Sequence, residues 1–325
     1  MSLPERLGRL RRVDLLGVGG FATVWLYRDD DLDSDVAVKA LAENWAQRLD
    51  IRERFLEEAR ILRRADSDHV VRVYDIGEEE GTPYFVMTYA DLGSLASVVE
   101  AGVPVPAARV VDLMCQAGEG VGVLHSQGVV HRDIKPPNLL LRSDGEHEPR
   151  LLVADLGVAK AMLHASGLTQ VVGTPAYMAP EQANGLGVDS RADIHALAAV
   201  AYQLLTGKPV RTGGFASLAD ASLPPAPSTV ADVPAAVDDV ILRALQRDPA
   251  ARYPDVTEFV AALRSAVPPT PPPPTGAFPA TASGPVTLAE VPPTGRSPGW
   301  LLALLVVLVL AASFALSYAV TVRLR

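Results

Sequence analysis

The hydrophobic pattern of the chain changes its period near residue 100. Before that point, short runs alternate apolar and polar residues between turn residues, which is typical of β-strands: 11–20, 21–29, 35–41, 70–78 and 82–90. One helical run, residues 50–65, lies among them, and after residue 105 the pattern is mostly helical. The pattern predicts an α+β fold over residues 1–266, with a small sheet-rich N-terminal part and a larger helical C-terminal part.

The C-terminal end has a different character. Residues 300–322 carry no charged side chain, with Trp300 at one end and Tyr318 near the other. About 20 apolar residues span a bilayer core, and Trp and Tyr suit its interfaces. We expect a transmembrane helix here, followed by a short extracytoplasmic tail at 323–325. The alternative is a buried core helix, which would need protein on all sides.

Residues 267–299 are rich in Pro, Thr, Gly and Ala and show neither the strand nor the helix period. Such a segment buries too little apolar surface to offset its ordering entropy, so we expect a disordered juxtamembrane linker. The stretch "PPTPPPP" within it suits a spacer, and alternatively a ligand for a proline-recognition domain.

Composition limits the possible partners. The net charge is −9 and the pI about 5.2, which argues against a general nucleic-acid binder. The chain has one cysteine, Cys115, so no internal disulfide is possible, and we expect this residue to be buried on a helix. We expect no secretory signal, because residues 1–16 lack an apolar core segment.

A glycine-rich stretch lies between the first two predicted strands. In "LLGVGGFATVWLY" the glycines at 17, 19 and 20 allow close approach of the backbone to a ligand, and their N–H groups suit phosphate oxygens. A strand follows rather than a helix, which argues against a dinucleotide-binding fingerprint. Lys39 interrupts the next apolar strand on the face of Ala37 and Leu41, and Glu58 in the following helix could hold it in place.

The stretch "VVHRDIKPPNLLL" (129–141) packs charged residues between apolar runs. Asp133 and Asn138 lie five apart in it, and Asp155 opens "DLG" further on. An oxygen-rich set of this kind suits Mg²⁺. Lys135 could neutralise a transferred phosphate, and the two prolines after it indicate a loop rather than a helix.

Five motifs then follow one another in order: "GVGGFATV", "VAVK", "HRDIKPPN", "DLG" and "APE". Over about residues 10–265 the chain resembles a bacterial eukaryotic-type (Hanks-type) serine/threonine protein kinase. The resemblance implies a bilobal kinase domain at 1–266, with an N-lobe at about 10–90 and a C-lobe at about 91–266. ATP and Mg²⁺, with Mn²⁺ as an alternative metal, would bind between the lobes.

The resemblance also implies residue roles. Asp133 would accept or orient the proton of the substrate hydroxyl, and Lys135 after "HRD" is similar to serine/threonine rather than tyrosine kinases. Lys39 would contact the phosphates and pair with Glu58, with Glu57 as the less favoured neighbour. Asn138 and Asp155 would hold the metal. The remaining ATP-contacting residues would be Leu16, Gly17, Val18, Gly19, Gly20, Val24, Ala37, Met87, Tyr89 and Leu140.

Other matches imply structural or regulatory roles. His131 would orient the catalytic loop, Asp193 would anchor its backbone, and Glu181 of "APE" would pair with Arg252. The activation segment would run from Asp155 to Glu181. Its candidate residues are Thr169 as the best phosphate acceptor, Ser166 as the second, Thr174 beside the catalytic residues, and Arg132 as the partner of a phosphate.

Four positions depart from the family pattern. Ala22 replaces the usual third glycine and would stiffen the phosphate-binding loop, Leu156 replaces the common Phe, and "IHALA" differs at His195 and Ala198. None of these removes a charged catalytic group, which disfavours the alternative of a catalytically weak pseudokinase that acts as an ATP-binding scaffold.

The combined expectation is a membrane-tethered signalling kinase that phosphorylates proteins, including itself, on Ser and Thr. Arg296 lies on the kinase side of the apolar run, and Arg323 and Arg325 lie beyond it, which weakly favours a cytoplasmic C-terminus. The need for ATP outweighs this and places the kinase domain in the cytoplasm, attached to the cell membrane by a single span. Activation would use a transient homodimer.

Overall fold

The structure is a computed structural model that describes residues 3–145, 147–157, 175–184, 187–213, 217–218 and 222–267. The chain divides into two units, Met1–Val286 and Thr287–Arg325, and all described residues belong to the first. The expected linker beyond Val267 and the expected transmembrane segment lie outside the described residues. Within the described ranges, no helix is both long and apolar enough for a membrane crossing.

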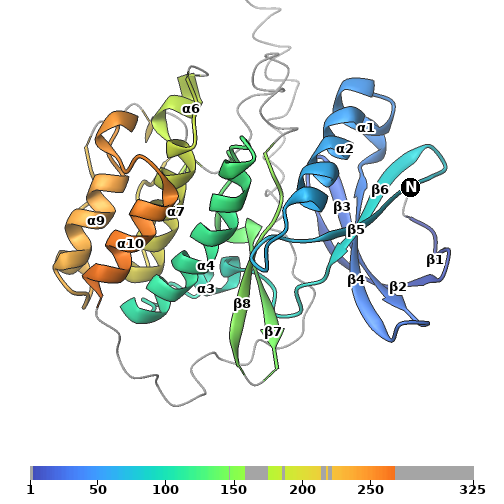
Figure 1. Ribbon diagram of the computed structural model, residues 1–325, viewed down its shortest axis with the longest axis horizontal. Helices are drawn as coiled ribbons and strands as arrows, with labels where there is room; N and C mark the ends of the chain where they lie inside the picture. Colours follow the sequence, from blue (N-terminus) through green and yellow to red (C-terminus); the bar gives the residue numbers. More distant parts are fainter. Residues whose placement is uncertain are drawn as a thin grey trace, which may run out of the picture. The chain divides into compact units, whose positions relative to one another are not determined.

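The N-terminal lobe is built on an antiparallel sheet with two helices beside it (Figure 1). The strand order is β1-β2-β3-β4-β6-β5. The strands are β1 (Arg6–Leu7), β2 (Leu10–Val18), β3 (Ala22–Asp29), β4 (Ser34–Leu41), β5 (Val73–Glu79) and β6 (Thr82–Thr88). The helices are α1 (Glu43–Ala46) and α2 (Leu49–Arg64). The period-two runs of the sequence therefore form the expected sheet.

Strand β4 separates two hydrophobic clusters, because successive side chains point to opposite faces. Ala37 and Leu41, on the face of Lys39, belong to the large core that continues into the helical lobe. The intervening side chains, Val36, Val38 and Ala40, belong to a smaller cluster that the N-terminal residues Leu3 and Leu7 help to close. The alternation thus turns Lys39 toward the interior.

Helix α2 packs one stripe against the sheet. Its buried side chains recur with the helical period: Ile51, Phe55, Glu58, Ala59, Ile61 and Leu62. Phe55 also contacts Phe85 of β6, with ring centroids 5.0 Å apart. The single acidic residue in this stripe, Glu58, is therefore carried into the interior by apolar neighbours.

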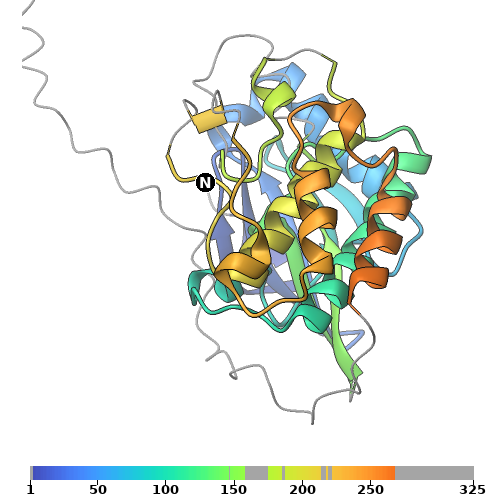
Figure 2. The same cartoon turned by 90° about the vertical axis from the view of Figure 1, so that its left-hand side faces the viewer.

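The C-terminal lobe is mostly helical, and in Figure 2 its helices lie in front of the strands. Its helices are α3 (Leu95–Glu100), α4 (Ala107–Ser126), α6 (Pro180–Asn184), α7 (Arg191–Thr206), α8 (Pro227–Val230), α9 (Ala236–Ala244) and α10 (Val256–Ala266). Helix α7 is buried almost throughout. Cys115 is buried in α4, as expected, and its Sγ accepts a hydrogen bond from Arg264 Nε of α10 at 3.0 Å.

A β-hairpin interrupts the helical pattern that the sequence favours after residue 105. Strands β7 (Leu139–Asp144) and β8 (His147–Val153) pair antiparallel, next to the catalytic stretch. Val71 N–H donates to Val153 O at 2.9 Å, which links the hairpin to the chain between α2 and β5. The two prolines before β7 lie in a three-residue 3₁₀ helix, Pro136–Asn138, where the sequence predicted a loop rather than a helix.

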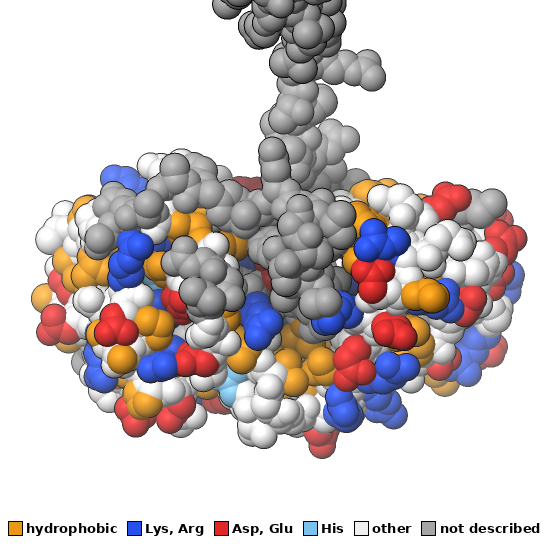
Figure 3. Space-filling view, turned by 90° about the horizontal axis from the view of Figure 1, so that it is seen from above, with side chains coloured by type: hydrophobic (Ala, Val, Ile, Leu, Met, Phe, Trp, Pro, Cys, Tyr) orange, Lys and Arg blue, Asp and Glu red, His pale blue; other side chains and the backbone are white. Residues whose placement is uncertain are grey.

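Acidic and basic side chains are interspersed on the face shown in Figure 3 and do not gather on one lobe. In the N-terminal lobe, Arg11 pairs with Asp30 at 3.0 Å and Arg28 with Asp35 at 3.1 Å. Exposed pairs of this kind add little stability.

Candidate active site

The catalytic stretch is anchored to the most buried helix of the C-terminal lobe. Asp193 of α7 is 1% exposed, and its two carboxylate oxygens accept hydrogen bonds from the backbone N–H groups of His131 and Arg132, each at 2.8 Å. His125 Nε2 lies 2.8 Å from the same carboxylate. Arg132 has φ +65°, a left-handed conformation that is uncommon for a non-glycine residue. Asp193 therefore fixes a turn that would be unfavourable by itself.

The His131 ring connects two backbone segments of the site. It is fully buried, its Nε2 donates to Ala154 O at 3.0 Å, and its Nδ1 accepts from Asp133 N–H at 3.3 Å. Burial lowers the pKa of His131, so the ring stays neutral and keeps this donor–acceptor arrangement. Both contacts are to backbone groups, which suits an orienting role rather than proton transfer.

Two side chains meet the predicted catalytic aspartate, Asp133. Asn138 Nδ2 donates to Asp133 Oδ2 at 2.9 Å and to Asp133 O at 2.8 Å. Lys135 Nζ lies 3.2 Å from the same Oδ2. The structure thus brings Asp133, Lys135 and Asn138 together, with the carboxylate beside a cation.

Lys39 bridges the two lobes. Its Nζ lies 2.8 Å from Glu58 Oε1 and 2.9 Å from Asp155 Oδ1. Burial alone would lower the pKa of Lys39, but the attraction of Asp155 and Glu58 outweighs it and raises the pKa above the ordinary lysine value. Glu57 instead faces Arg60 and Arg64 on the outer side of α2. Glu58 is therefore the partner in this structure, as expected.

The residues proposed for a metal ion fit a hard cation. Asn138 directs Nδ2 to Asp133, which leaves its amide oxygen as the remaining polar atom, and Nδ2 also lies 3.4 Å from Asp155 O. The Asp155 side chain is 45% exposed, and its backbone has φ +57°. Mg²⁺ commonly takes one or two carboxylates together with substrate phosphates. An amide oxygen and a partly exposed carboxylate are a donor set of this kind.

The residues expected to contact ATP fall into two groups. Ala37 and Met87 are buried and pair across β4 and β6, while the residues that pack against the same core from its edge are half-buried: Leu16, Val24, Tyr89 and Leu140. Within the glycine-rich stretch Gly17 is buried, whereas Val18, Gly19 and Gly20 are exposed. Backbone at the tip of this hairpin is thus accessible to a ligand.

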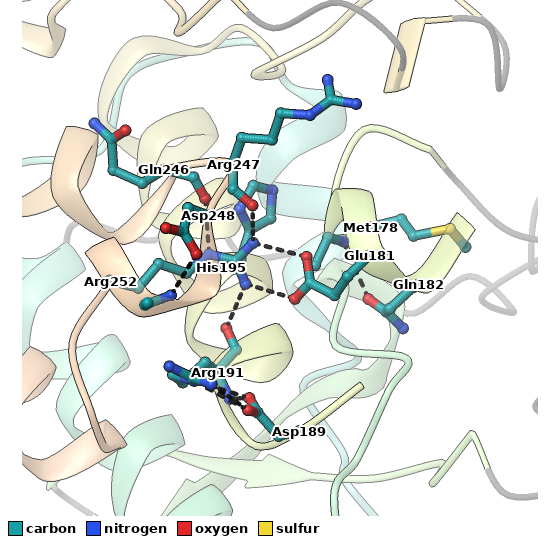
Figure 4. A network of polar contacts seen from close by, with 12 residues as sticks. Met178, Glu181, Gln182, Asp189, Arg191, His195, Gln246, Arg247, Asp248 and Arg252 are labelled. Carbon is teal, nitrogen blue, oxygen red and sulfur yellow. Dashed lines mark hydrogen bonds and ion pairs between the residues drawn. The ribbon is translucent and has the colours of Figure 1, made fainter. Parts of the chain in front are cut away.

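The expected Glu181–Arg252 pair is present in the C-terminal lobe (Figure 4). Arg252 Nη1 and Nη2 each donate to one Glu181 carboxylate oxygen at 2.7 Å. The same guanidinium donates to three backbone carbonyls, those of Gln246, Arg191 and Arg247. All five of its N–H groups therefore have protein acceptors.

Sequence reasoning missed one polar bridge between the catalytic stretch and α6. Gln182 Nε2 donates to Arg132 O at 2.9 Å, and its Oε1 accepts from Ala179 N–H at 3.0 Å. The only sequence signal is its place directly after "APE". The glycine of the "DLG" motif, Gly157, lies close to the same stretch, since a Cβ there would lie 3.0 Å from His131 O.

The predicted regulatory residues Ser166, Thr169 and Thr174 lie outside the described residues. Of the expected activation segment, the structure describes residues 155–157 and 175–181. The role assigned to the Arg132 side chain therefore stays a prediction.

Comparison with known proteins agrees with this geometry. Residues 10–260 match the protein kinase domain family. The chain belongs to this family. Serine/threonine-protein kinase Pkn1 of Myxococcus xanthus is 38% identical over 270 residues, which cover 81% of this chain and 39% of Pkn1. Serine/threonine-protein kinase PknB of Mycobacterium leprae is 33% identical over 277 residues, which cover 81% of this chain and 44% of PknB.

Solved structures of this kinase family give the same architecture. The crystal structure of the Mycobacterium tuberculosis PknI kinase domain superposes with a TM-score of 0.65 at 27% identity, covering 82% of this chain and all of that domain. The chain spans less than half the length of the curated relatives that it matches. The bilobal fold expected from the sequence is thus confirmed for the kinase domain.

Proposed function

We propose that this protein kinase domain transfers the γ-phosphoryl group of ATP to Ser or Thr hydroxyls of proteins. The observation that carries the proposal is the cluster of Asp133, Lys135 and Asn138 beside the bridge that Lys39 makes to Glu58 and Asp155. The names of the curated relatives, serine/threonine-protein kinases, support the substrate class.

The residues divide the work by position and charge. Asp133 accepts the hydrogen bond of the substrate hydroxyl and aligns it with the phosphoryl group. Lys135, 3.2 Å from that carboxylate, offsets negative charge that builds up during transfer. Lys39 holds the ATP phosphates, and Glu58 holds Lys39. Alignment and charge compensation supply most of the acceleration, because a loose phosphoryl-transfer transition state needs little covalent chemistry.

Asn138 and Asp155 would hold Mg²⁺, which neutralises phosphate charge when bound. The amide oxygen of Asn138 is aimed by the two hydrogen bonds that its nitrogen donates to Asp133. A change at Asn138 would therefore disturb Asp133 as well as the metal.

The decisive test uses the purified full-length protein with labelled ATP, Mg²⁺ and a generic protein substrate. The variants Asp133→Asn and Lys39→Met are compared with Lys208→Met, a matched control at an exposed lysine. We expect label on Ser and Thr in the wild type and the control, and labelling slower by about 10²-fold or more in the two site variants. A wild type that binds ATP yet transfers no phosphate would instead favour the scaffold function.

Membrane attachment and regulation are part of the same proposal. The uncharged run at 300–322 supports a single span with the kinase domain in the cytoplasm. Autophosphorylation at Thr169, with Ser166 as the second acceptor, would occur in a transient homodimer and order the segment through Arg132. Sites mapped by mass spectrometry elsewhere would contradict this choice of acceptors, and extraction of the protein from membranes by alkaline carbonate would contradict the span.

A further inference from the structure

The tip of the glycine-rich hairpin is a tight turn. Gly19 N–H donates to Ala22 O at 2.8 Å, directly beyond the last register pair of β2 and β3, Val18 with Thr23. A Cβ at Gly19 would lie 3.3 Å from Ala22 O. Gly20 and Phe21 therefore form the whole turn, and they are the residues that the rest of the lobe could hold.

Three contacts hold that turn to the chain after β4. Ala42 N–H donates to Phe21 O at 2.8 Å and so extends the β3–β4 ladder by one residue. Trp45 Nε1 donates to Gly20 O at 2.8 Å. The Trp45 and Phe21 rings lie 5.2 Å apart between centroids, tilted by 35°. Trp45 thus contacts the tip through both its polar and its apolar atoms.

Trp45 is also tied to the helix that carries Glu58. It lies in α1, where its N–H donates to Ala42 O at 2.8 Å, and its carbonyl accepts from Arg48 N–H at 2.9 Å. Arg48 O then accepts from Arg52 N–H of α2, also at 2.9 Å. A continuous run of turn hydrogen bonds therefore connects the hairpin tip to α2.

We propose that Trp45 is a positioning residue that holds the glycine-rich turn in place for the phosphate groups of the nucleotide. The inference rests on the proposed kinase function and adds a residue to it. Two adjacent glycines have more backbone freedom than any other pair, and fixing them on binding costs conformational entropy. A turn fixed beforehand avoids that cost at the moment of binding.

The test compares affinities for ADP with Mg²⁺ and for adenosine, using full-length protein. Trp45→Phe removes the hydrogen bond to Gly20 but keeps a ring beside Phe21, and Trp45→Ala removes both. We expect ADP to bind about two- to tenfold more weakly to Trp45→Phe, the range for one hydrogen bond, and adenosine to bind as in the wild type. The matched control is Trp25→Phe in β3, whose ring lies 4.9 Å from the Arg12 guanidinium on the other side of the sheet.

Equal weakening for ADP and adenosine would mean general damage to the lobe and would overturn the inference. Unchanged ADP affinity in Trp45→Phe would overturn it too. Both results leave the kinase proposal intact, whereas a wild type that binds neither ligand would remove both.

A second measurement needs no change at Trp45. The chain has three tryptophans, so Trp25→Phe/Trp300→Phe leaves Trp45 as the only one. We expect its emission to change when ADP with Mg²⁺ binds and to stay constant with adenosine. An identical response to the two ligands would contradict the assignment.

Discussion

Each lobe contains a buried ion pair, Lys39–Glu58 in the N-terminal lobe and Glu181–Arg252 in the C-terminal lobe. Arg252 is 0% exposed, and protein acceptors use all five of its N–H groups. Lys39 divides its ammonium group between Glu58 and Asp155, and Asp155 is 45% exposed. The Arg252 pair is thus enclosed by protein groups, whereas Lys39 also contacts a carboxylate, Asp155, that is partly exposed to solvent.

The difference separates a structural charge from one that can exchange partners. A guanidinium with every donor satisfied by fixed groups can only hold those groups together, here α6, the first residue of α7 and the segment that follows α9. An ammonium shared with a half-exposed carboxylate can turn toward a phosphate without leaving a buried donor unpaired. Substitutions in the two pairs should therefore differ in what they change, stability for Arg252 and activity for Lys39.

Removal of Arg252 should cost the most. Arg252→Met leaves Glu181 and three carbonyls without their donor, so we expect the free energy of unfolding to fall by about 3–5 kcal/mol. Urea denaturation would measure it. Arg243→Met is the matched control. This exposed arginine lies over the Tyr253 ring, 4.1 Å from its centroid, and its substitution should change the free energy of unfolding by about 1 kcal/mol or less. Equal losses in the two variants would remove the contrast.

Lys39→Met should reduce kcat/KM about 10²–10³-fold, the usual effect of losing one electrostatic donor. It also leaves the Glu58 carboxylate buried, so stability should fall. Lys39→Met/Glu58→Met should recover that stability but no activity, because two apolar side chains replace the ion pair.

The corresponding double change in the other lobe should behave differently. Arg252→Met/Glu181→Met still deprives the carbonyls of Gln246, Arg191 and Arg247 of their donor, so we expect no recovery of stability. Full recovery there would show that the two pairs are equivalent.

His195 should make the C-terminal network sensitive to acid. Burial lowers the pKa of His195 well below its usual value, with Arg252 and Arg211 adding to the shift, and its Nδ1 has no partner among the described residues. The unfolded chain takes up a proton as the pH falls through about 6.5, and the folded chain does not. The contribution of His195 to the free energy of unfolding is therefore fully present above that pH. Below it, the free energy of unfolding falls by about 1.4 kcal/mol per pH unit for this group.

Urea unfolding between pH 7.5 and 5.5 measures the slope. His195→Phe should lower the number of protons taken up on unfolding, which sets this slope, by about one. His147→Phe, a change at an exposed histidine, should leave the slope unaltered. His131, whose pKa is also lowered by burial, contributes a second part of the slope in the same direction. An unchanged slope in His195→Phe would contradict the assignment.

Gln182 should have the smallest effect. It connects the helix that carries Glu181 to Arg132 O of the catalytic stretch, so Gln182→Leu should lower kcat about two- to tenfold, as expected for one hydrogen bond. The KM for ATP should stay the same, because no nucleotide-contacting residue is involved. A change in KM alone would place Gln182 elsewhere in the mechanism.

Much of the N-terminal lobe follows from the sequence because its strands alternate at period two, and that period alone turns Lys39 inward with Ala37 and Leu41. The hairpin β7–β8 did not, because its outer half, "RSDGEHEPR", is charged on both faces. Gly145, the residue directly after β7, is a turn signal that could have revealed it, and it has φ +64°.

The candidate site shows the same limit. Asp133 and Asn138 are visible in the sequence because a charged stretch between apolar runs is unusual, and Asp155 because it opens the "DLG" motif. Trp45 and Gln182 are not, because their partners, Gly20 O and Arg132 O, are backbone atoms 25 and 50 residues away. Contacts between a side chain and distant backbone leave no local pattern.

The burial of Cys115 has a practical consequence for spectroscopy. It is the single cysteine of the chain, and burial raises the pKa of its thiol, partly opposed by Arg264, so little reactive thiolate forms. A pair of cysteines introduced at exposed positions, Leu49→Cys in the N-terminal lobe and Val103→Cys in the C-terminal lobe, would take up thiol-reactive dyes in preference to it. Energy transfer between the dyes would then report the movement of the lobes in the native background.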